Sequence, residues 1–173
     1  MTGILPVTLP VEPLSEEAFA PFGDVIQLTG ARQMLINEGT TVRFHDLAQV
    51  DVAGAGGRPL VSIFRAQPRP VPIAIRMMER HPLGSQAFYP LAPHDWLVVV
   101  CQGEPVPEPA TLRCFLATGE QGVNYRPNAW HHPLLVLRPQ DFLVIDRGGP
   151  GDNLEEFRFA GAEPASVNYF CPD

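Results

Sequence analysis

The chain has 173 residues, of which 45% are hydrophobic, and its formal net charge is −7. This length and composition favour one folded domain over residues 1–173, and the negative charge argues against a nucleic-acid partner. No apolar run approaches the roughly 18 residues that a membrane span needs. All twelve basic residues are arginine, so Schiff-base chemistry and a lysine base are excluded.

The N-terminal segment and the cysteines indicate where the protein works. Residues 1–6 lack a basic stretch followed by an apolar one, so they do not resemble a secretory signal. Cys101, Cys114 and Cys171 are an odd number without metal-binding spacing. We therefore expect a cytoplasmic protein without a disulfide framework.

One short helix is expected near the N-terminus. Ser15 is a favourable N-cap, and Glu16 and Glu17 place negative charge in the first turn. Gly23 follows Phe22 as a stop signal. We predict that the apolar side of this helix packs on a sheet.

The rest of the chain is predicted to form strands. Twenty prolines divide it into short apolar segments separated by turns. Alternation and β-branched or aromatic content predict strands at residues 24–28, 32–36, 41–47, 60–66, 73–78, 86–91, 96–101, 112–117, 134–137, 142–145 and 155–159. Many short strands joined by turns are typical of a sandwich or a barrel, whose interior can hold one small ligand.

Three of the five histidines lie in two runs, residues 79–88 and 121–133. His81 is placed where a strand enters a turn, while Gln86 and Phe88 share one face of the next strand. Either His81 caps the turn and Gln86 fills a polar gap, or both point into a cavity as ligands.

The second run contains the adjacent residues His131 and His132. Neighbours on a strand face opposite sides, so only one of them can point into a cavity. The sequence does not decide which one. The best candidate site is therefore built from His81, Gln86 and either His131 or His132.

Two arginines could bind an anion. Arg65 is predicted within an apolar strand, where a charge is costly unless it is paired. It either pairs with Asp46 or Asp146, or holds a substrate carboxylate with its planar fork. Arg43 can share a strand face with His45, although an exposed surface pair is the alternative.

These runs resemble the cupin superfamily and, more closely, the ureidoglycolate lyase family. The similarity extends from about residue 14 to residue 149, and its most specific segments are residues 22–26, 43–48, 62–66, 79–88, 119–125, 130–133 and 141–149. The resemblance implies a mainly β, cupin-like barrel of the jelly-roll type with a short N-terminal helix, assembled as a homodimer. It also implies release of urea from (S)-ureidoglycolate to leave glyoxylate, in the recovery of purine nitrogen from allantoin.

The resemblance further implies a site. If Gln86 takes the place of the cupin glutamate, Glu79, His81 and His132 fall on the other motif positions, and a divalent metal would be held by His81, Gln86 and His132. Some members of the family use nickel, and imidazole and oxygen donors suit nickel, zinc or manganese; a metal-free barrel is the alternative.

Roles for further residues follow from the chemistry of this substrate. Arg65 is assigned to the substrate carboxylate, with Arg43 and Gln86 as further substrate contacts. Asn124 and Tyr125 either hydrogen-bond the ureido group or satisfy a turn. The base would be His81 or His132, and the proton donor Glu79 or Tyr125.

Two other functions fit the same cavity. The chain could be a barrel that binds a small carboxylate without catalysis, or a cupin isomerase acting on sugars. In each case the expected partner is a small molecule.

Overall fold

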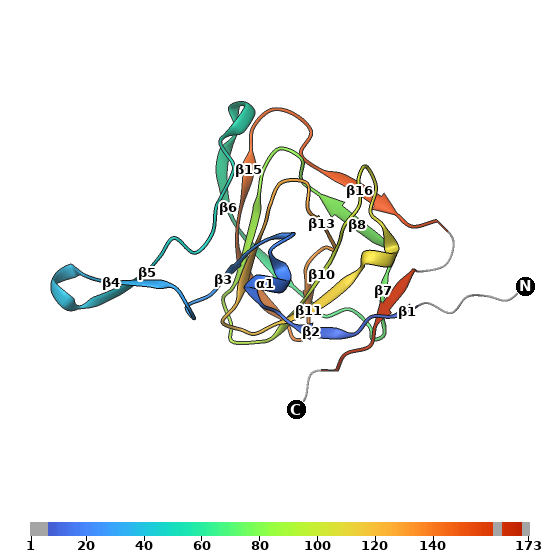
Figure 1. The fold of residues 1–173 in the computed structure, drawn as a ribbon, viewed down its shortest axis with the longest axis horizontal. Helices are drawn as coiled ribbons and strands as arrows, with labels where there is room; N and C mark the ends of the chain where they lie inside the picture. Colours follow the sequence, from blue (N-terminus) through green and yellow to red (C-terminus); the bar gives the residue numbers. More distant parts are fainter. Residues whose placement is uncertain (1–6, 161–163, 171–173) are drawn as a thin grey trace, which may run out of the picture.

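The computed structural model describes residues 7–160 and 164–170 (Figure 1). Within them, two β-sheets face each other around an apolar interior, and one short helix, α1 (Glu16–Phe19), packs beside them. The predicted mainly β, cupin-like fold with a short N-terminal helix is confirmed. No described helix has the length and apolar character needed to cross a bilayer.

In the described part of the chain, the larger sheet has seven strands. Its order is β16 (Glu155–Arg158), β8 (Met77–Arg80), β13 (Trp130–His131), β10 (Trp96–Cys101), β11 (Arg113–Ala117) and β2 (Val11–Pro13), with β14 (Leu135–Val136) also paired to β10. The facing sheet has five strands in the order β3 (Gly23–Ile26), β12 (Gly122–Tyr125), β9 (Gln86–Pro90), β15 (Gln140–Gly148) and β6 (Arg58–Ala66).

Two smaller sheets complete the described structure. One consists of β1 (Val7–Thr8), β17 (Ala165–Val167) and β7 (Ile73–Ile75). The other is the hairpin of β4 (Arg32–Ile36) and β5 (Thr41–His45), which pair only with each other and project from the body (Figure 1).

The core is divided into two apolar clusters. The first lies between the two facing sheets and α1 and includes Phe19, Phe115, Phe142 and Val144. The second packs against the other face of the seven-stranded sheet and contains Leu9, Ile73, Ile75, Met78, Leu97, Val99, Cys101, Leu112, Cys114, Trp130, Leu135, Ala165 and Val167. Burial raises the pKa of both the Cys101 and Cys114 thiols to about 12, so these cysteines stay protonated and act as apolar residues.

Local chemistry accounts for α1 and the strand that follows it. The Ser15 hydroxyl accepts a hydrogen bond from the Ala18 amide at 3.2 Å, as expected of an N-cap. Gly23 has φ +148°, and an added Cβ would collide with the Asn124 carbonyl. Only glycine therefore lets β3 pair closely with β12.

Most predicted strands are present, with shifted ends. The segment 73–78 is divided into β7 and β8, because the chain moves from one sheet to another at Arg76. The short strands β12 and β13 were not predicted. Each has only two to four residues and carries polar groups, so neither shows an extended apolar alternation.

We expect the first cluster to be sensitive to cavities. Phe115 is fully buried and meets Phe19 edge-on at 6.1 Å, so Phe115→Ala should lower the free energy of unfolding by about 3–5 kcal/mol. Val106→Ala, at a side chain that is 48% exposed, should change it by less than about 0.5 kcal/mol. Denaturant unfolding measures both values, and equal effects would contradict this description of the core.

Candidate active site

Three potential ligands meet inside the barrel: Glu79, His81 and His131. One donor atom from each lies within 4.8 Å of the others. Glu79 and His131 are paired directly across β8 and β13, and residues paired in this way point to the same face of a sheet. His81 follows β8 and reaches the same space, with its ring 5.4 Å from that of His131.

Hydrogen bonds fix the orientation of both imidazoles. His81 Nδ1 lies 2.7 Å from the Asn153 carbonyl oxygen, and His131 Nδ1 lies 2.9 Å from the Ala129 carbonyl oxygen. A carbonyl only accepts, so each Nδ1 carries the proton and donates. Each Nε2 therefore presents a lone pair to the cluster when the ring is neutral. Both Nε2 atoms are buried without a hydrogen-bond partner.

The Glu79 carboxylate faces the His131 lone pair. Its Oε1 lies 3.5 Å from His131 Nε2, which is longer than a strong charge-assisted hydrogen bond. Two electron-pair donors that face each other in a buried space require a proton or a metal cation between them. Two imidazoles and one carboxylate are a donor set that suits a divalent transition metal and leaves coordination positions open.

Burial and charge set the protonation of the cluster. Burial would raise the pKa of Glu79, but the proximity of His131, with smaller contributions from His81 and His132, holds it below its ordinary value. Burial and then the charge of His131 lower the pKa of His81. An ionised carboxylate and a neutral imidazole are therefore favoured at neutral pH.

Side chains from the facing sheet close the other side of the cluster. Tyr125 on β12 stacks on His131 with ring centroids 4.0 Å apart and an interplanar angle of 10°. Burial raises the pKa of Tyr125, so its hydroxyl keeps its proton. Gln86 on β9 pairs with Tyr125 and donates a hydrogen bond from Nε2 to Asp146 at 3.2 Å. Its Oε1 is buried and unpartnered.

Four predicted site residues thus lie together: Glu79, His81, Gln86 and Tyr125. His131 joins them, so the structure corrects the expectation that His132 occupies this position. His132 follows the end of β13, and its Nδ1 lies 2.7 Å from the Pro133 carbonyl oxygen. It lines a neighbouring cavity and not the cluster itself, and burial lowers its pKa to about 4.

The two predicted arginines lie elsewhere. Arg65 is on β6, has a side chain that is 78% exposed, and forms a two-point ion pair with Asp141 at 2.9 and 3.0 Å. Its partner is therefore neither Asp46 nor Asp146. Arg43 lies on the projecting hairpin with His45. Within a single chain, neither arginine reaches the cluster of Glu79, His81 and His131.

Asn124 also differs from its expected placement. It is buried, but its amide donates to Asp24 at 3.0 Å and to the Gln49 carbonyl at 2.8 Å. Asn124 precedes Tyr125 on β12 and so points to the opposite face of the sheet. Its role is to fix the residue 49 loop against the outer face.

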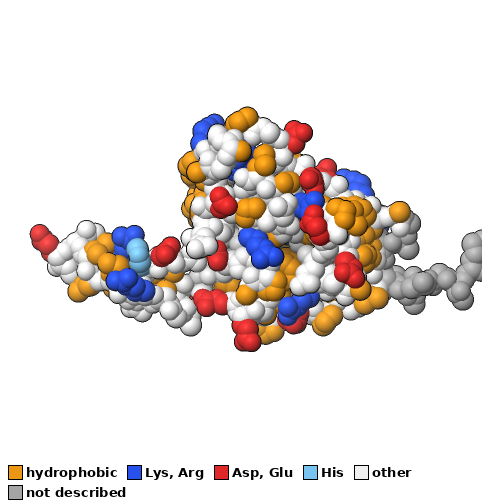
Figure 2. Space-filling view, turned by 45° about the horizontal axis from the view of Figure 1, so that its top comes forward, with side chains coloured by type: hydrophobic (Ala, Val, Ile, Leu, Met, Phe, Trp, Pro, Cys, Tyr) orange, Lys and Arg blue, Asp and Glu red, His pale blue; other side chains and the backbone are white. Residues whose placement is uncertain are grey.

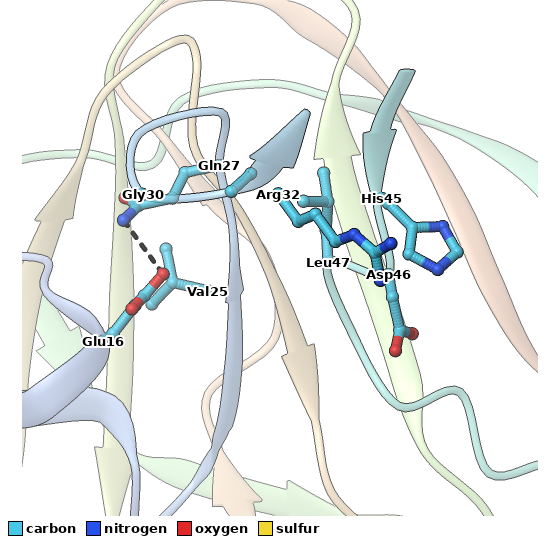
Figure 3. A pocket seen from close by; sticks show the side chains of 9 residues that line it. Glu16, Val25, Gln27, Gly30, Arg32, His45, Asp46 and Leu47 are labelled. Carbon is cyan, nitrogen blue, oxygen red and sulfur yellow. Dashed lines mark hydrogen bonds between the residues drawn. The ribbon is translucent and has the colours of Figure 1, made fainter. Parts of the chain in front are cut away.

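A hollow of 380 Å³ at the base of the hairpin is separate from the cluster (Figure 3). Arg32, His45 and Asp46 line one side, and Glu16 accepts a hydrogen bond from Gln27 at 3.2 Å on the other. None of the three potential ligands lines this hollow.

Sequence reasoning missed two contributors to the cluster. Asp146 was considered only as an ion-pair partner, yet it lies next to Gln86 and its charge acts on His81. Asn153 orients His81 through its backbone carbonyl, for which a sequence carries no signal.

Comparisons with known proteins find one family. A family model described as Ureidoglycolate lyase matches residues 6–167. A protein named ureidoglycolate lyase from Burkholderia mallei (strain NCTC 10229) is 56% identical over 150 residues, covering 86% of this chain and 88% of its own. Similar proteins of the same name come from Brucella anthropi, 60% identical over 154 residues (88% and 90% coverage), and Burkholderia cepacia, 60% identical over 149 residues (86% and 84% coverage).

The imidazole orientations can be measured directly. In metal-free protein at pH 8, the ¹⁵N NMR spectra of His81 and His131 should show the proton on Nδ1, because each Nδ1 donates to a backbone carbonyl. Single His→Gln variants assign the signals. A proton on Nε2 of either ring would contradict the arrangement of the cluster.

Proposed function

The chain belongs to the ureidoglycolate lyase family, and we propose that it releases urea from (S)-ureidoglycolate at the cluster of Glu79, His81 and His131. The convergence of these three donors in one buried space supports this location. The relatives described above are all named as lyases, which disfavours a non-catalytic barrel or a sugar isomerase. Release of urea and glyoxylate would serve the recovery of purine nitrogen from allantoin.

The reaction needs one proton removed and one supplied. One carbon of ureidoglycolate carries the hydroxyl, the carboxylate and a urea nitrogen. The hydroxyl loses its proton, its oxygen forms the carbonyl of glyoxylate, and the C–N bond breaks with both electrons passing to nitrogen. The nitrogen then gains a proton and leaves as urea.

Residues of the cluster can perform both transfers. His81 is kept neutral by burial, so its Nε2 can accept the hydroxyl proton. Glu79 is ionised and can stabilise the resulting imidazolium. Tyr125 retains its proton and can donate it to the departing nitrogen, while the stacked ring of His131 holds the phenol in place.

A divalent metal fits the same residues. Glu79, His81 and His131 would hold it, since their donors converge and two of the Nε2 atoms are otherwise unpartnered. Bound there, the metal would occupy the His81 Nε2 lone pair and would take over the role of His81, supplying positive charge that favours loss of the hydroxyl proton. Gln86, whose Oε1 is also unpartnered, could orient the substrate beside it.

We also propose that two copies form a homodimer through the outer face of the five-stranded sheet. Val61 and Ile63 on β6 are 70% and 55% exposed, and they pair with Ile145 and Leu143 of β15 on this face. The β4–β5 hairpin extends from the body with exposed apolar and arginine side chains (Figure 2). A two-stranded hairpin is only marginally stable alone, so packing against a second copy would stabilise it.

Substitution within the cluster tests the catalytic proposal. His81→Gln removes the proposed base and His131→Gln removes the ring that holds the proposed acid, Tyr125, so each should lower kcat for urea release from (S)-ureidoglycolate by at least about 100-fold. His94→Gln, at a histidine whose backbone carbonyl contacts Gln140 away from the cluster, should keep kcat. Coupled assays for urea and ammonia distinguish a lyase from a hydrolase. Ammonia as the product would refute the proposed reaction, and full activity in His131→Gln would refute the proposed site.

Sedimentation tests the dimer. The wild-type chain should sediment at twice the monomer mass, and Ile63→Asp should shift it towards the monomer because it buries a charge in the proposed interface. Val106→Asp serves as the matched control on a loop outside this face. A monomeric wild type, or a dimer unaffected by Ile63→Asp, would contradict the proposed interface.

A further inference from the structure

A second cavity adjoins the cluster on the seven-stranded sheet. It has a volume of 390 Å³, and its lining includes Arg69, Met77, His132 and Arg158. Met77 lies two residues before Glu79 on β8, so both point to the same face about 7 Å apart. His132, which lines the cavity, lies close enough to Glu79 for their charges to interact. The cavity is therefore a close neighbour of the three potential ligands.

Strand pairing directs Arg158 to this side of the sheet. Arg158 on β16 pairs with Met77, and Glu156 pairs with Glu79. Met78 and Phe157, on the alternate positions, belong to the apolar cluster on the other face. Arg158 therefore shares the face of Glu79, and Arg69 approaches from the loop that follows β6.

The charge of this cavity is positive. Its described lining has three arginines, Arg69, Arg76 and Arg158, and no carboxylate. Neither Arg69 nor Arg158 forms an ion pair within the part of the chain that the structure describes. Arg69 and Arg158 are two cations at one cavity without an anionic partner, which favours a bound anion.

Other arginines have partners away from the cluster. Arg65 pairs with Asp141, Arg80 with Glu155 and Arg113 with Glu12. Arg147 is buried and donates to the carbonyl oxygens of Gly54, Ala55 and Pro150. The carboxylate function assigned to Arg65 from sequence therefore needs a different residue.

We propose that Arg69 and Arg158 bind the carboxylate of the substrate in this cavity and so direct the neighbouring carbinol carbon to Glu79, His81 and His131. This inference rests on the proposed function. In ureidoglycolate the carboxylate is attached to the carbon whose C–N bond breaks, so a clamp must lie close to the catalytic groups. The planar guanidinium fork can hold both carboxylate oxygens. His132, buried at the edge of the cavity, limits the space available to a small acid.

Steady-state kinetics of the intact protein test the clamp. Arg158→Gln and Arg69→Gln should each raise KM for (S)-ureidoglycolate by about 10- to 100-fold, with a smaller effect on kcat, because charge-assisted hydrogen bonds are lost. Arg158→Lys should recover part of the loss. Arg65→Gln, which breaks only an exposed ion pair, should leave KM unchanged, and thermal melting checks that every variant is folded.

Direct binding separates this inference from the proposed function. Calorimetry with glycolate should show binding to the wild type that is at least about 10-fold weaker in Arg158→Gln, whereas uncharged glycolamide should bind both equally poorly. If the wild type releases no urea but glycolate binding still depends on Arg158, the lyase proposal fails and the carboxylate cavity stands. If the wild type is an active lyase and the Arg69→Gln/Arg158→Gln double variant keeps both KM and glycolate affinity, the clamp is overturned.

Discussion

The structure depends on one constraint. Two imidazole lone pairs and one carboxylate face each other in a buried space. Each group alone would be unfavourable there without a partner. Backbone carbonyls of Asn153 and Ala129 hold the protons on the opposite sides of the two rings, so the rings cannot satisfy each other. A proton or a cation must therefore occupy the centre.

The fold supplies this arrangement through strand pairing. Glu79 and His131 are brought together because β8 and β13 pair in that register, and β12 and β9 of the facing sheet bring Tyr125 and Gln86 opposite them. A shift of one residue in either sheet would move these side chains to the other face. The closely packed Gly23 on β3 and the buried aromatic residues of the first core cluster hold the registers that the site needs.

Much of the fold could be predicted from the sequence, because it depends on local chemistry. Ser15 and the two glutamates after it predict α1, and strands such as β4 and β10 follow apolar alternation or β-branched content. The short strands β12 and β13 depend instead on partners far along the chain. This difference explains why the sequence indicated the two runs that meet at the cluster but not every residue in it.

The residues that meet in the structure differ from the predicted ones where two sheets, and not one strand, determine the geometry. Adjacent histidines must face opposite sides, but only the pairing of β13 with β8 selects His131 over His132. Arg65 seemed costly in an apolar strand, yet β6 is an outer strand of its sheet and leaves that guanidinium exposed beside Asp141. Arg158 carried no signal in the sequence, because its position beside the site depends on the pairing of β16 with β8.

The proposal that a metal cation occupies the cluster is tested most directly by titrating a divalent metal into chelator-treated protein and following heat and proton release. We predict binding of one nickel or zinc ion per chain in the wild type and in His94→Gln, and loss of that binding in Glu79→Gln and in His131→Gln. Stoichiometric binding that survives both substitutions, or a wild type that binds neither metal, would contradict it.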